Sequence, residues 1–132
     1  MADPAFWRGK RVLLTGHTGF KGGWAAHWLA AMGAEVTGFA LPPLTDPSLF
    51  DLTGAPVDSH LGDLRDRDAV EAVVGGAAPE IVLHLAAQPL VRQSYADPVE
   101  TWASNVMGTV HLMEALRARA APMTILIVTT DK

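Results

Sequence analysis

The feature that most constrains the fold is a run of three spaced glycines directly behind a short apolar segment. Residues 15–22 read Thr-Gly-His-Thr-Gly-Phe-Lys-Gly, and they follow the strand-like residues 11–14. Gly16 can adopt a backbone conformation closed to other residues, Gly19 lets the main chain approach a phosphate, and Gly22 lets the next helix lie close to the strand. The start of that helix offers free N–H donors and a partial positive charge. The pattern predicts a site for a dinucleotide pyrophosphate.

The segments on either side of the glycines decide how much weight the pattern carries. A glycine pattern alone is weak evidence, because glycines also cluster in ordinary turns that bind nothing. Here a strand-like run precedes the glycines, a helical run follows them, and residues 33–39 provide a helix stop and a second strand. This order predicts a βαβ unit and favours the dinucleotide site over a turn without a ligand.

The remainder of the chain continues the alternation of strands and helices. The expected elements are a weak strand at 59–61, a helix at 67–74 capped by Asp66, an apolar strand at 80–85, a long helix from 98 to about 119 capped by Asp97, and a fifth strand at 123–129. Right-handed crossovers then predict an α/β fold, a Rossmann-type doubly wound parallel sheet with the strand order 3-2-1-4-5, truncated after strand 5. The fifth strand would be an apolar edge prone to association.

Composition excludes several classes of partner. The 132 residues suit one domain, and the net charge of −4 gives no reason to expect nucleic acid or a membrane surface as partner. Without cysteine there is no disulfide or thiolate metal site, and the five histidines lack the spacing of metal ligands, so no metal is expected. No membrane span or signal peptide is recognisable, and a cytoplasmic location is the default expectation. Trp24, Trp28 and Met32 recur at helical spacing and are expected to pack on the sheet.

Ligands of such sheets bind at the carboxyl ends of the strands, so the candidate residues are taken from there. Asp63 could accept a hydrogen bond from adenine or merely start a turn, Lys21 could reach the pyrophosphate or face water, and Arg92 could touch a substrate phosphate or lie on the surface. The candidate cofactor-binding residues are Gly16, Thr18, Gly19, Phe20, Lys21, Gly22, Asp63, Leu64, Leu85, Ala86 and Ala87, and the weaker candidates for substrate binding are Gln88 and Arg92.

The choice between the two nicotinamide cofactors depends on residues after the second strand. The acid that usually meets a free ribose there is missing, because Ala40 and Leu41 stand at that point. A 2′-phosphate would instead need a cation, and no Lys or Arg occurs between Lys21 and Arg65. The missing cation favours NAD over NADP.

Several motifs together are more specific than the glycines. They are His-Thr-Gly-Phe-Lys-Gly at 17–22, Gly-Asp-Leu-Arg-Asp at 62–66, His-Leu-Ala-Ala-Gln-Pro-Leu-Val-Arg at 84–92, Asn-Val-Met-Gly-Thr at 105–109 and Thr-Asp-Lys at 130–132. With these motifs the chain resembles the extended short-chain dehydrogenases, and more narrowly the CDP-glucose 4,6-dehydratases, from residue 6 to residue 132.

The resemblance implies a redox-neutral dehydration of CDP-D-glucose to CDP-4-dehydro-6-deoxy-D-glucose, with a bound NAD reduced and reoxidised in each turnover. It places Thr130 at the reacting C4 oxygen and Asp131 as the acid that protonates the leaving C6 hydroxyl. Lys132 stands where relatives carry a glutamate base, and Asn105 matches a helix asparagine that supports the catalytic lysine. The alternative for Asn105 is a bond to backbone inside its helix. The family also implies a homodimer.

One part of the family pattern is missing. The catalytic Tyr-x-x-x-Lys pair cannot be found, since Tyr95 is the sole tyrosine, is expected in a loop, and is followed by Val99 four residues later. We therefore interpret residues 1–132 as the NAD-binding domain of a longer enzyme, inactive alone, with the substrate region elsewhere. The alternatives are another NAD-dependent sugar-nucleotide epimerase or dehydratase, or a non-catalytic NAD-binding module.

Overall fold

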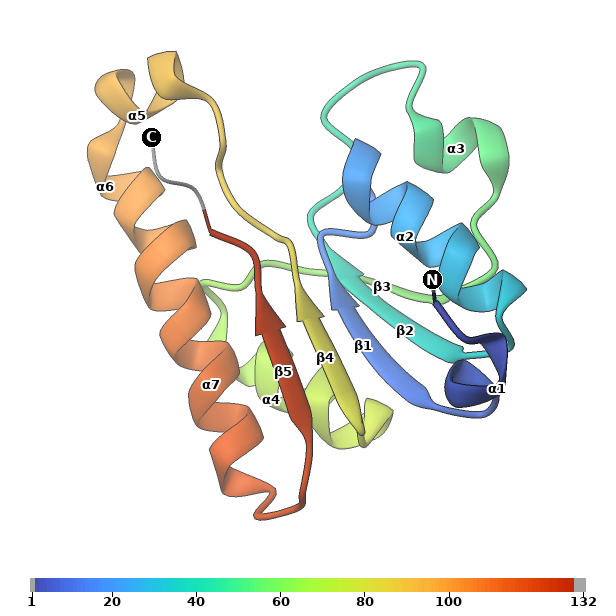
Figure 1. The fold of residues 1–132 in the computed structure, drawn as a ribbon. Coiled ribbons are helices and arrows are strands. Elements are labelled where there is room, and N and C mark those ends of the chain that lie inside the picture. The colour runs from blue at the N-terminus through green and yellow to red at the C-terminus, as the bar shows by residue number, and fades with distance from the viewer. Residues whose placement is uncertain (1, 130–132) are drawn as a thin grey trace.

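The computed structural model describes residues 2–129, which form one parallel sheet with helices on both faces (Figure 1). The strand order is β3-β2-β1-β4-β5, and this confirms the Rossmann-type order 3-2-1-4-5. Every neighbouring pair is parallel, and β1 lies at the centre, paired with β2 on one side and β4 on the other. The strands are β1 (Arg11–Thr15), β2 (Glu35–Ala40), β3 (Asp58–Leu61), β4 (Ile81–His84) and β5 (Thr124–Ile127).

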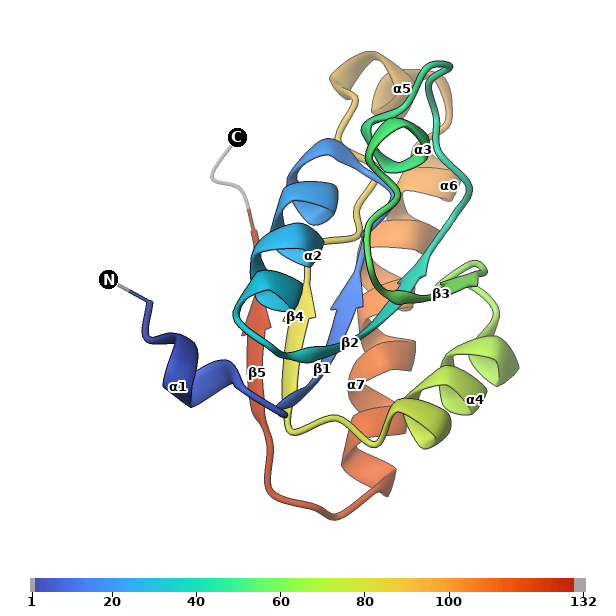
Figure 2. The same ribbon diagram turned by 90° about the vertical axis from the view of Figure 1, so that its right-hand side faces the viewer.

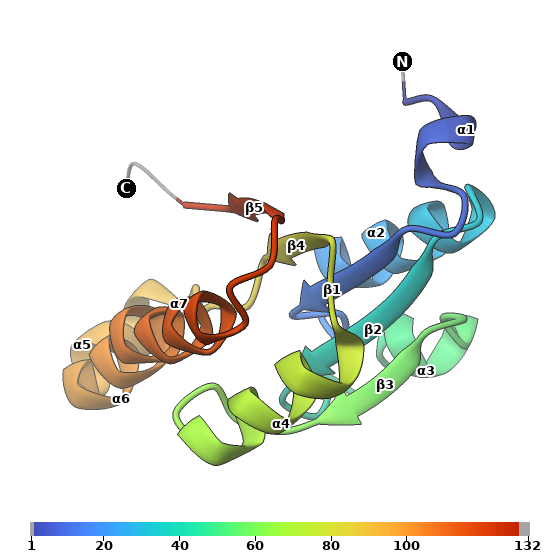
Figure 3. The ribbon, with the colours of Figure 1, turned by 90° about the horizontal axis from the view of Figure 1, so that it is seen from below.

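The helices divide between the two faces of the sheet, as the view from below shows (Figure 3). Helices α4 and α7 cover one face, whereas α2 covers the other face over β1 and β2. The helices are α1 (Pro4–Trp7), α2 (Phe20–Ala31), α3 (Leu49–Thr53), α4 (Arg67–Ala77), α5 (Val91–Ala96), α6 (Pro98–Trp102) and α7 (Gly108–Ala118), with a π-helical segment η1 (Ala103–Met107) between α6 and α7.

The central strand separates two apolar cores because alternate side chains point to opposite faces. Leu13 packs with Val82 and Leu112 in the core beneath α4 and α7. Val12 and Leu14 point the other way and pack beneath α2. The side chains of Val12, Leu13 and Leu14 are essentially inaccessible to solvent. The glycine turn that follows β1 is thus attached to a strand that is buried on both faces.

The long helix expected from residue 98 is confirmed in extent but is not uniform. The Asp97 carboxylate accepts from the backbone N–H of Glu100, as the cap prediction required, and Pro98 occupies the first turn. The five residues of η1 then interrupt the α-helical pattern before α7 begins. Such π-helical insertions are frequent at functional sites, and Asn105 lies in the middle of this one.

Two expectations about aromatic residues are wrong. Trp24 and Trp28 do not pack on the sheet, since 56% and 62% of their surfaces are exposed, whereas Met32 is buried as expected. Ala26 carries the buried face of α2, and two residues along a helix amount to about 200° of rotation, so Trp24 faces away from that core. Tyr95 lies in the short helix α5 and not in a loop.

The edge at β5 remains open among residues 2–129. Strand β5 pairs with β4 alone, and Leu126 and Val128 are about half exposed. Figure 3 shows no helix of the described chain over β5 on the side that carries α2. The expectation of an uncovered apolar fifth strand is confirmed for this part of the chain.

Candidate functional site at the carboxyl edge of the sheet

All five strands run toward the same end of the molecule, where their following segments meet (Figures 1 and 2). The glycine turn after β1 contacts the segment after β4 most closely. Gly16 has φ +80°, and a Cβ atom there would lie 2.9 Å from the backbone nitrogen of Ala86. Only glycine combines this left-handed conformation with so close an approach. The prediction for the turn at Gly16 is confirmed in its geometry.

The start of α2 fits an anionic group. Gly19 precedes the first residue of the helix and makes no side-chain cap, so no side chain of residues 2–129 caps the N–H groups of the first turn. A Cβ at Gly19 would meet only the Gly16 carbonyl oxygen, at 3.4 Å, which leaves the approach to this helix end open among the described residues. Gly22 has no such space, since a Cβ there would lie 2.0 Å from the same oxygen. These features suit a pyrophosphate held by backbone donors.

The side chains of the turn have separate tasks. The Thr18 hydroxyl donates to the carbonyl of Leu41 at 2.8 Å and so joins the turn to the segment after β2. Phe20 and Lys21 are exposed in the first turn of α2. Lys21 is therefore near the helix start that suits a phosphate, and its contact with one stays a prediction.

His17 is a buried link between the turn and the outer strands. Its Nε2 lies 2.7 Å from the Ser59 hydroxyl of β3, and Gly38 of β2 leaves the space that the ring occupies. Burial lowers the pKa of His17, and the neighbouring His60 lowers it further. The Phe50 ring of α3 packs edge-on against it, with 5.3 Å between the ring centroids. A neutral His17 thus belongs to the support of the turn.

The end of β3 is organised by an ion pair. The Asp63 carboxylate accepts from the backbone N–H of Arg65 at 2.9 Å and from its guanidinium, which holds the pKa of Asp63 below its usual range. This is the turn-forming role weighed above, while a bond to adenine stays a prediction. Leu64 is buried against Gly108, where a Cβ atom would lie 2.8 Å from the Leu64 Cβ.

Asn105 does bond to backbone, but to that of another segment and not of its own helix. Its Oδ1 accepts from the N–H of Gln88 at 2.7 Å, and its Nδ2 donates to the carbonyl of Gln88 at 3.1 Å. The Gln88 side chain bonds to Thr101 and to both backbone groups of Leu90. The two predicted residues are thus brought together, and both shape the segment after β4.

The other predicted residues fall into two groups. Leu85 and Ala86 are partly buried beside the glycine turn, Ala87 is exposed just after them, and Arg92 is exposed on α5. Thr130, Asp131 and Lys132 lie outside the described residues, so their predicted roles are not tested by geometry.

Sequence reasoning missed a buried set of hydrogen bonds around His84. The ring lies between the hydroxyls of Thr15, at 2.6 Å from Nδ1, and Thr109, at 2.9 Å from Nε2. The available signal was a histidine at the end of an apolar strand that is covered on both faces, since a buried polar group needs partners. The partners of His84 are distant in sequence, so the sequence pattern could not identify them.

Comparison with known proteins assigns the family. A family model described as GDP-mannose 4,6 dehydratase matches residues 13–132. The chain belongs to this family. It is 49% identical to the CDP-glucose 4,6-dehydratase of Salmonella typhimurium over 134 aligned residues, which cover all of this chain and 37% of that protein. The chain thus spans little more than a third of the length of this relative.

Solved structures agree with this assignment. A UDP-glucose 4-epimerase from Bifidobacterium longum, in complex with NAD+ and UDP, matches with a TM-score of 0.76 and 26% identity over 91% of this chain and 37% of that one. The UDP-glucose 4-epimerase of Thermus thermophilus, in complex with NAD, matches with a TM-score of 0.71 and 34% identity over 81% of this chain and 33% of that one. The sequence and structural comparisons therefore place the chain among sugar-nucleotide dehydratases and epimerases.

Residues 2–129 offer neither a metal site nor a membrane-spanning helix. In that range no three His, Asp or Glu side chains are grouped so that they could hold a metal ion. No helix there has both the length and the apolar character that crossing a membrane requires.

Replacing Gly22 by alanine tests the turn. The added Cβ must displace the Gly16 carbonyl, and overpacking of this kind costs about 1–3 kcal/mol. We expect Gly22→Ala to weaken NAD+ binding by the full-length protein about tenfold or more, measured by calorimetry, because 1.4 kcal/mol corresponds to a factor of about ten. Gly75→Ala is the matched control, since a Cβ at Gly75 in α4 meets nothing within 4 Å. Equal NAD+ affinity for both variants would contradict the account of the turn.

Proposed function

We propose that the full-length protein is an NAD-dependent CDP-glucose 4,6-dehydratase, and that residues 1–132 are its cofactor-binding part. The observation that carries the proposal is the 49% identity to a CDP-glucose 4,6-dehydratase along the whole of this chain. Support comes from the turn at Gly16–Gly22, which leaves the start of α2 free for an anion, and from two NAD-bound structures with the same fold.

The chemistry balances without an external oxidant. Oxidation of the sugar at C4 makes the C5 proton acidic, so water can leave across C5 and C6. The two electrons removed at C4 are returned at C6, and CDP-D-glucose becomes CDP-4-dehydro-6-deoxy-D-glucose plus water. NAD, when bound, supplies the reversible two-electron acceptor. The turn at Gly16–Gly22 would hold its pyrophosphate, with Lys21 beside it.

The acid and base roles stay with residues at the end of the chain. Thr130 would hydrogen-bond the C4 oxygen, and Asp131 would protonate the leaving hydroxyl, for which its pKa must lie above the usual range. Lys132 would act as base or relay. Asn105 and Gln88 would shape the neighbouring segment through their mutual backbone bonds.

The domain proposal also has a structural argument. The face of the sheet beside α2 is open over β5, where Leu126 and Val128 are about half exposed. In the full-length enzyme, a later segment that carries the Tyr-x-x-x-Lys pair and the substrate region would follow, and part of it would cover this face. Exposed apolar patches of this kind mark surfaces that another segment or chain covers.

The acid assigned to Asp131 can be tested directly. We expect the full-length protein to convert CDP-glucose to a product lighter by one water, measured by mass spectrometry, with UDP-glucose and GDP-mannose as competing substrates. General-acid catalysis contributes about 10²–10⁴-fold, so Asp131→Asn should lose activity by that order while it retains NAD+ binding.

Asp68→Asn is the control, since Asp68 is exposed in the first turn of α4. Dehydration of a different sugar nucleotide in preference to CDP-glucose would overturn the substrate proposal. Unchanged turnover in Asp131→Asn would overturn the role of Asp131 as the acid, but not the substrate proposal.

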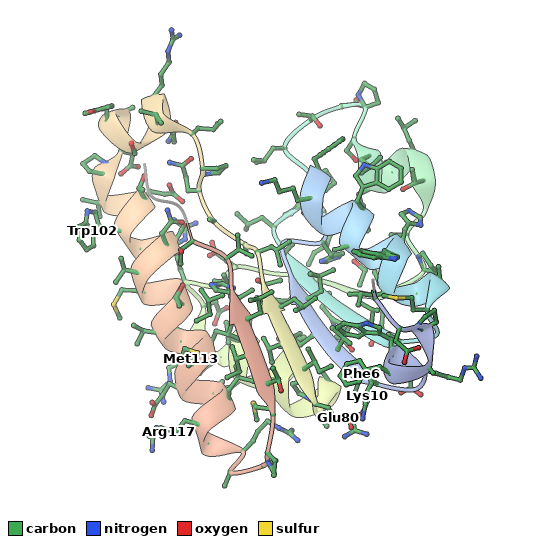
Figure 4. All side chains as sticks on the ribbon, in the orientation of Figure 1. Phe6, Lys10, Glu80, Trp102, Met113 and Arg117 are labelled. Carbon is green, nitrogen blue, oxygen red and sulfur yellow. The ribbon has the colours of Figure 1, made fainter. Side chains whose placement is uncertain are left out.

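We also propose that the full-length protein dimerises through the outer face of α6 and α7. Figure 4 shows Trp102, Met113 and Arg117 along this helical stretch. Five exposed apolar side chains follow one another at helical spacing, and we call them the outer stripe: Val99, Trp102, Val106, Val110 and Met113. A second copy is the occupant we propose, because the same stripe on two copies can pair about a two-fold axis.

A charged residue in the stripe should break the dimer. We expect Val110→Glu to shift the full-length protein from dimer to monomer in light scattering, because a buried unpaired carboxylate is costly. Leu44→Glu is the control, since Leu44 is 82% exposed in the segment after β2 and lies outside the outer stripe. A monomeric wild type, or a Val110→Glu protein that stays dimeric, would refute the proposal.

A further inference from the structure

We infer that His84 is a positioning residue, and that its neutral Nε2–H form closes a ring of hydrogen bonds between the glycine turn and the helix that carries Asn105. The inference rests on the proposed function only for the identity of the cofactor and substrate that these residues would position. The ring itself consists of contacts among described residues, and each step below assigns one proton.

The proton on the Thr15 side is fixed by the number of acceptor positions. The Thr15 hydroxyl oxygen accepts from the backbone N–H groups of Leu85 and Ala86, each at 3.1 Å, and the Leu85 N–H is shared with the Thr15 carbonyl oxygen at 3.3 Å. A hydroxyl has two acceptor lone pairs and one hydrogen. Both lone pairs are therefore used, and the 2.6 Å contact with His84 Nδ1 must be donated by Thr15. Nδ1 is then an acceptor, and the proton of the neutral ring lies on Nε2.

The other side of the ring agrees with this assignment. His84 Nε2–H donates to the Thr109 hydroxyl at 2.9 Å, and that hydroxyl donates onward to the carbonyl of Asn105 at 2.8 Å. The Asn105 side chain in turn holds both backbone groups of Gln88. Because Gln88 follows Leu85 and Ala86 on one segment, the path returns along the backbone to the residues that donate to Thr15.

These hydrogen bonds connect three parts whose relative positions matter for the proposed reaction: the glycine turn, the segment after β4 and η1. Thr15 is the last residue of β1 and immediately precedes Gly16 of the glycine turn. Leu85 and Ala86 lie against that turn, and Asn105 lies within η1, where the helix departs from α-helical geometry. A displacement of any one part must strain the other two, because buried hydrogen-bonded networks act as units.

The surroundings of the His84 imidazole keep it neutral. His84 is 3% exposed, and burial lowers its pKa. The groups that face it from β1 and α7 are the two threonine hydroxyls, and no charged side chain among residues 2–129 contributes to its pKa. A second proton on Nδ1 would point at the Thr15 oxygen, whose lone pairs are both occupied. The stability that these hydrogen bonds provide is therefore full above the usual histidine pKa, and it is lost as the pH falls through the lowered pKa of His84.

The position of the proton can be read by nuclear magnetic resonance without substrate or cofactor. In full-length protein labelled with ¹⁵N-histidine at pH 8, we expect His84 to carry its proton on Nε2. His111 is an internal control, because its Nδ1 lies 2.8 Å from the carbonyl of Leu64 and must donate. His111 should therefore carry its proton on Nδ1. A proton on Nδ1 of His84 would overturn the inference, whatever the true substrate is.

A pair of variants at Thr109 separates positioning from packing. Thr109→Val keeps the branched shape but removes the hydroxyl, whereas Thr109→Ser keeps the hydroxyl and loses a methyl group. Misplaced catalytic groups cost up to about 10²-fold, so we expect Thr109→Val to lower kcat/KM for CDP-glucose on the order of tenfold or more, and Thr109→Ser to retain most of the activity. If the serine variant lost as much activity as the valine variant, packing and not the hydrogen-bond ring would be responsible.

Discussion

The contact on which the rest of the site depends is the close approach of the turn after β1 to the segment after β4. Gly16 comes so near to Ala86 that no side chain fits between them, and the Thr15 hydroxyl binds the N–H groups of Leu85 and Ala86. The Ala86 N–H follows the strand end and would otherwise need another partner, whereas the Leu85 N–H also lies 3.3 Å from the Thr15 carbonyl oxygen. One glycine and one hydroxyl thus join the two central strands at the carboxyl edge of the sheet.

The parallel sheet makes this contact possible. Since β1 pairs with both β2 and β4, the segments that follow these three strands meet at one edge. Val12, Leu13 and Leu14 of β1 are buried on the two faces of the sheet, which holds the turn at Gly16 in place relative to α2. Because rigid strands and not mobile loops carry the turn, backbone N–H groups can be aimed at a phosphate before it arrives.

Sequence reasoning succeeded where the physical signal was local. The glycine spacing, the alternating strands and the Asp97 cap each depend on neighbouring residues, and all three are confirmed. It failed for Trp24 and Trp28, because helical spacing shows that two residues share a face but not what covers that face. The short helices α1, α3 and α5 were not predicted, since four to six residues carry too little periodicity. His84 was considered only among five histidines that lack metal-ligand spacing, and no local pattern links it to its partners Thr15 and Thr109, which are 69 and 25 residues away.

The central claim is that a dinucleotide pyrophosphate binds at the start of α2, over the turn from Gly16 to Gly22. The most direct measurement is a crystal structure of the full-length protein with NAD+. The account predicts both phosphates within hydrogen-bond distance of backbone N–H groups in this turn, and the nicotinamide directed toward the segment after β4. A pyrophosphate bound elsewhere, with the turn at Gly19 left free, would contradict it.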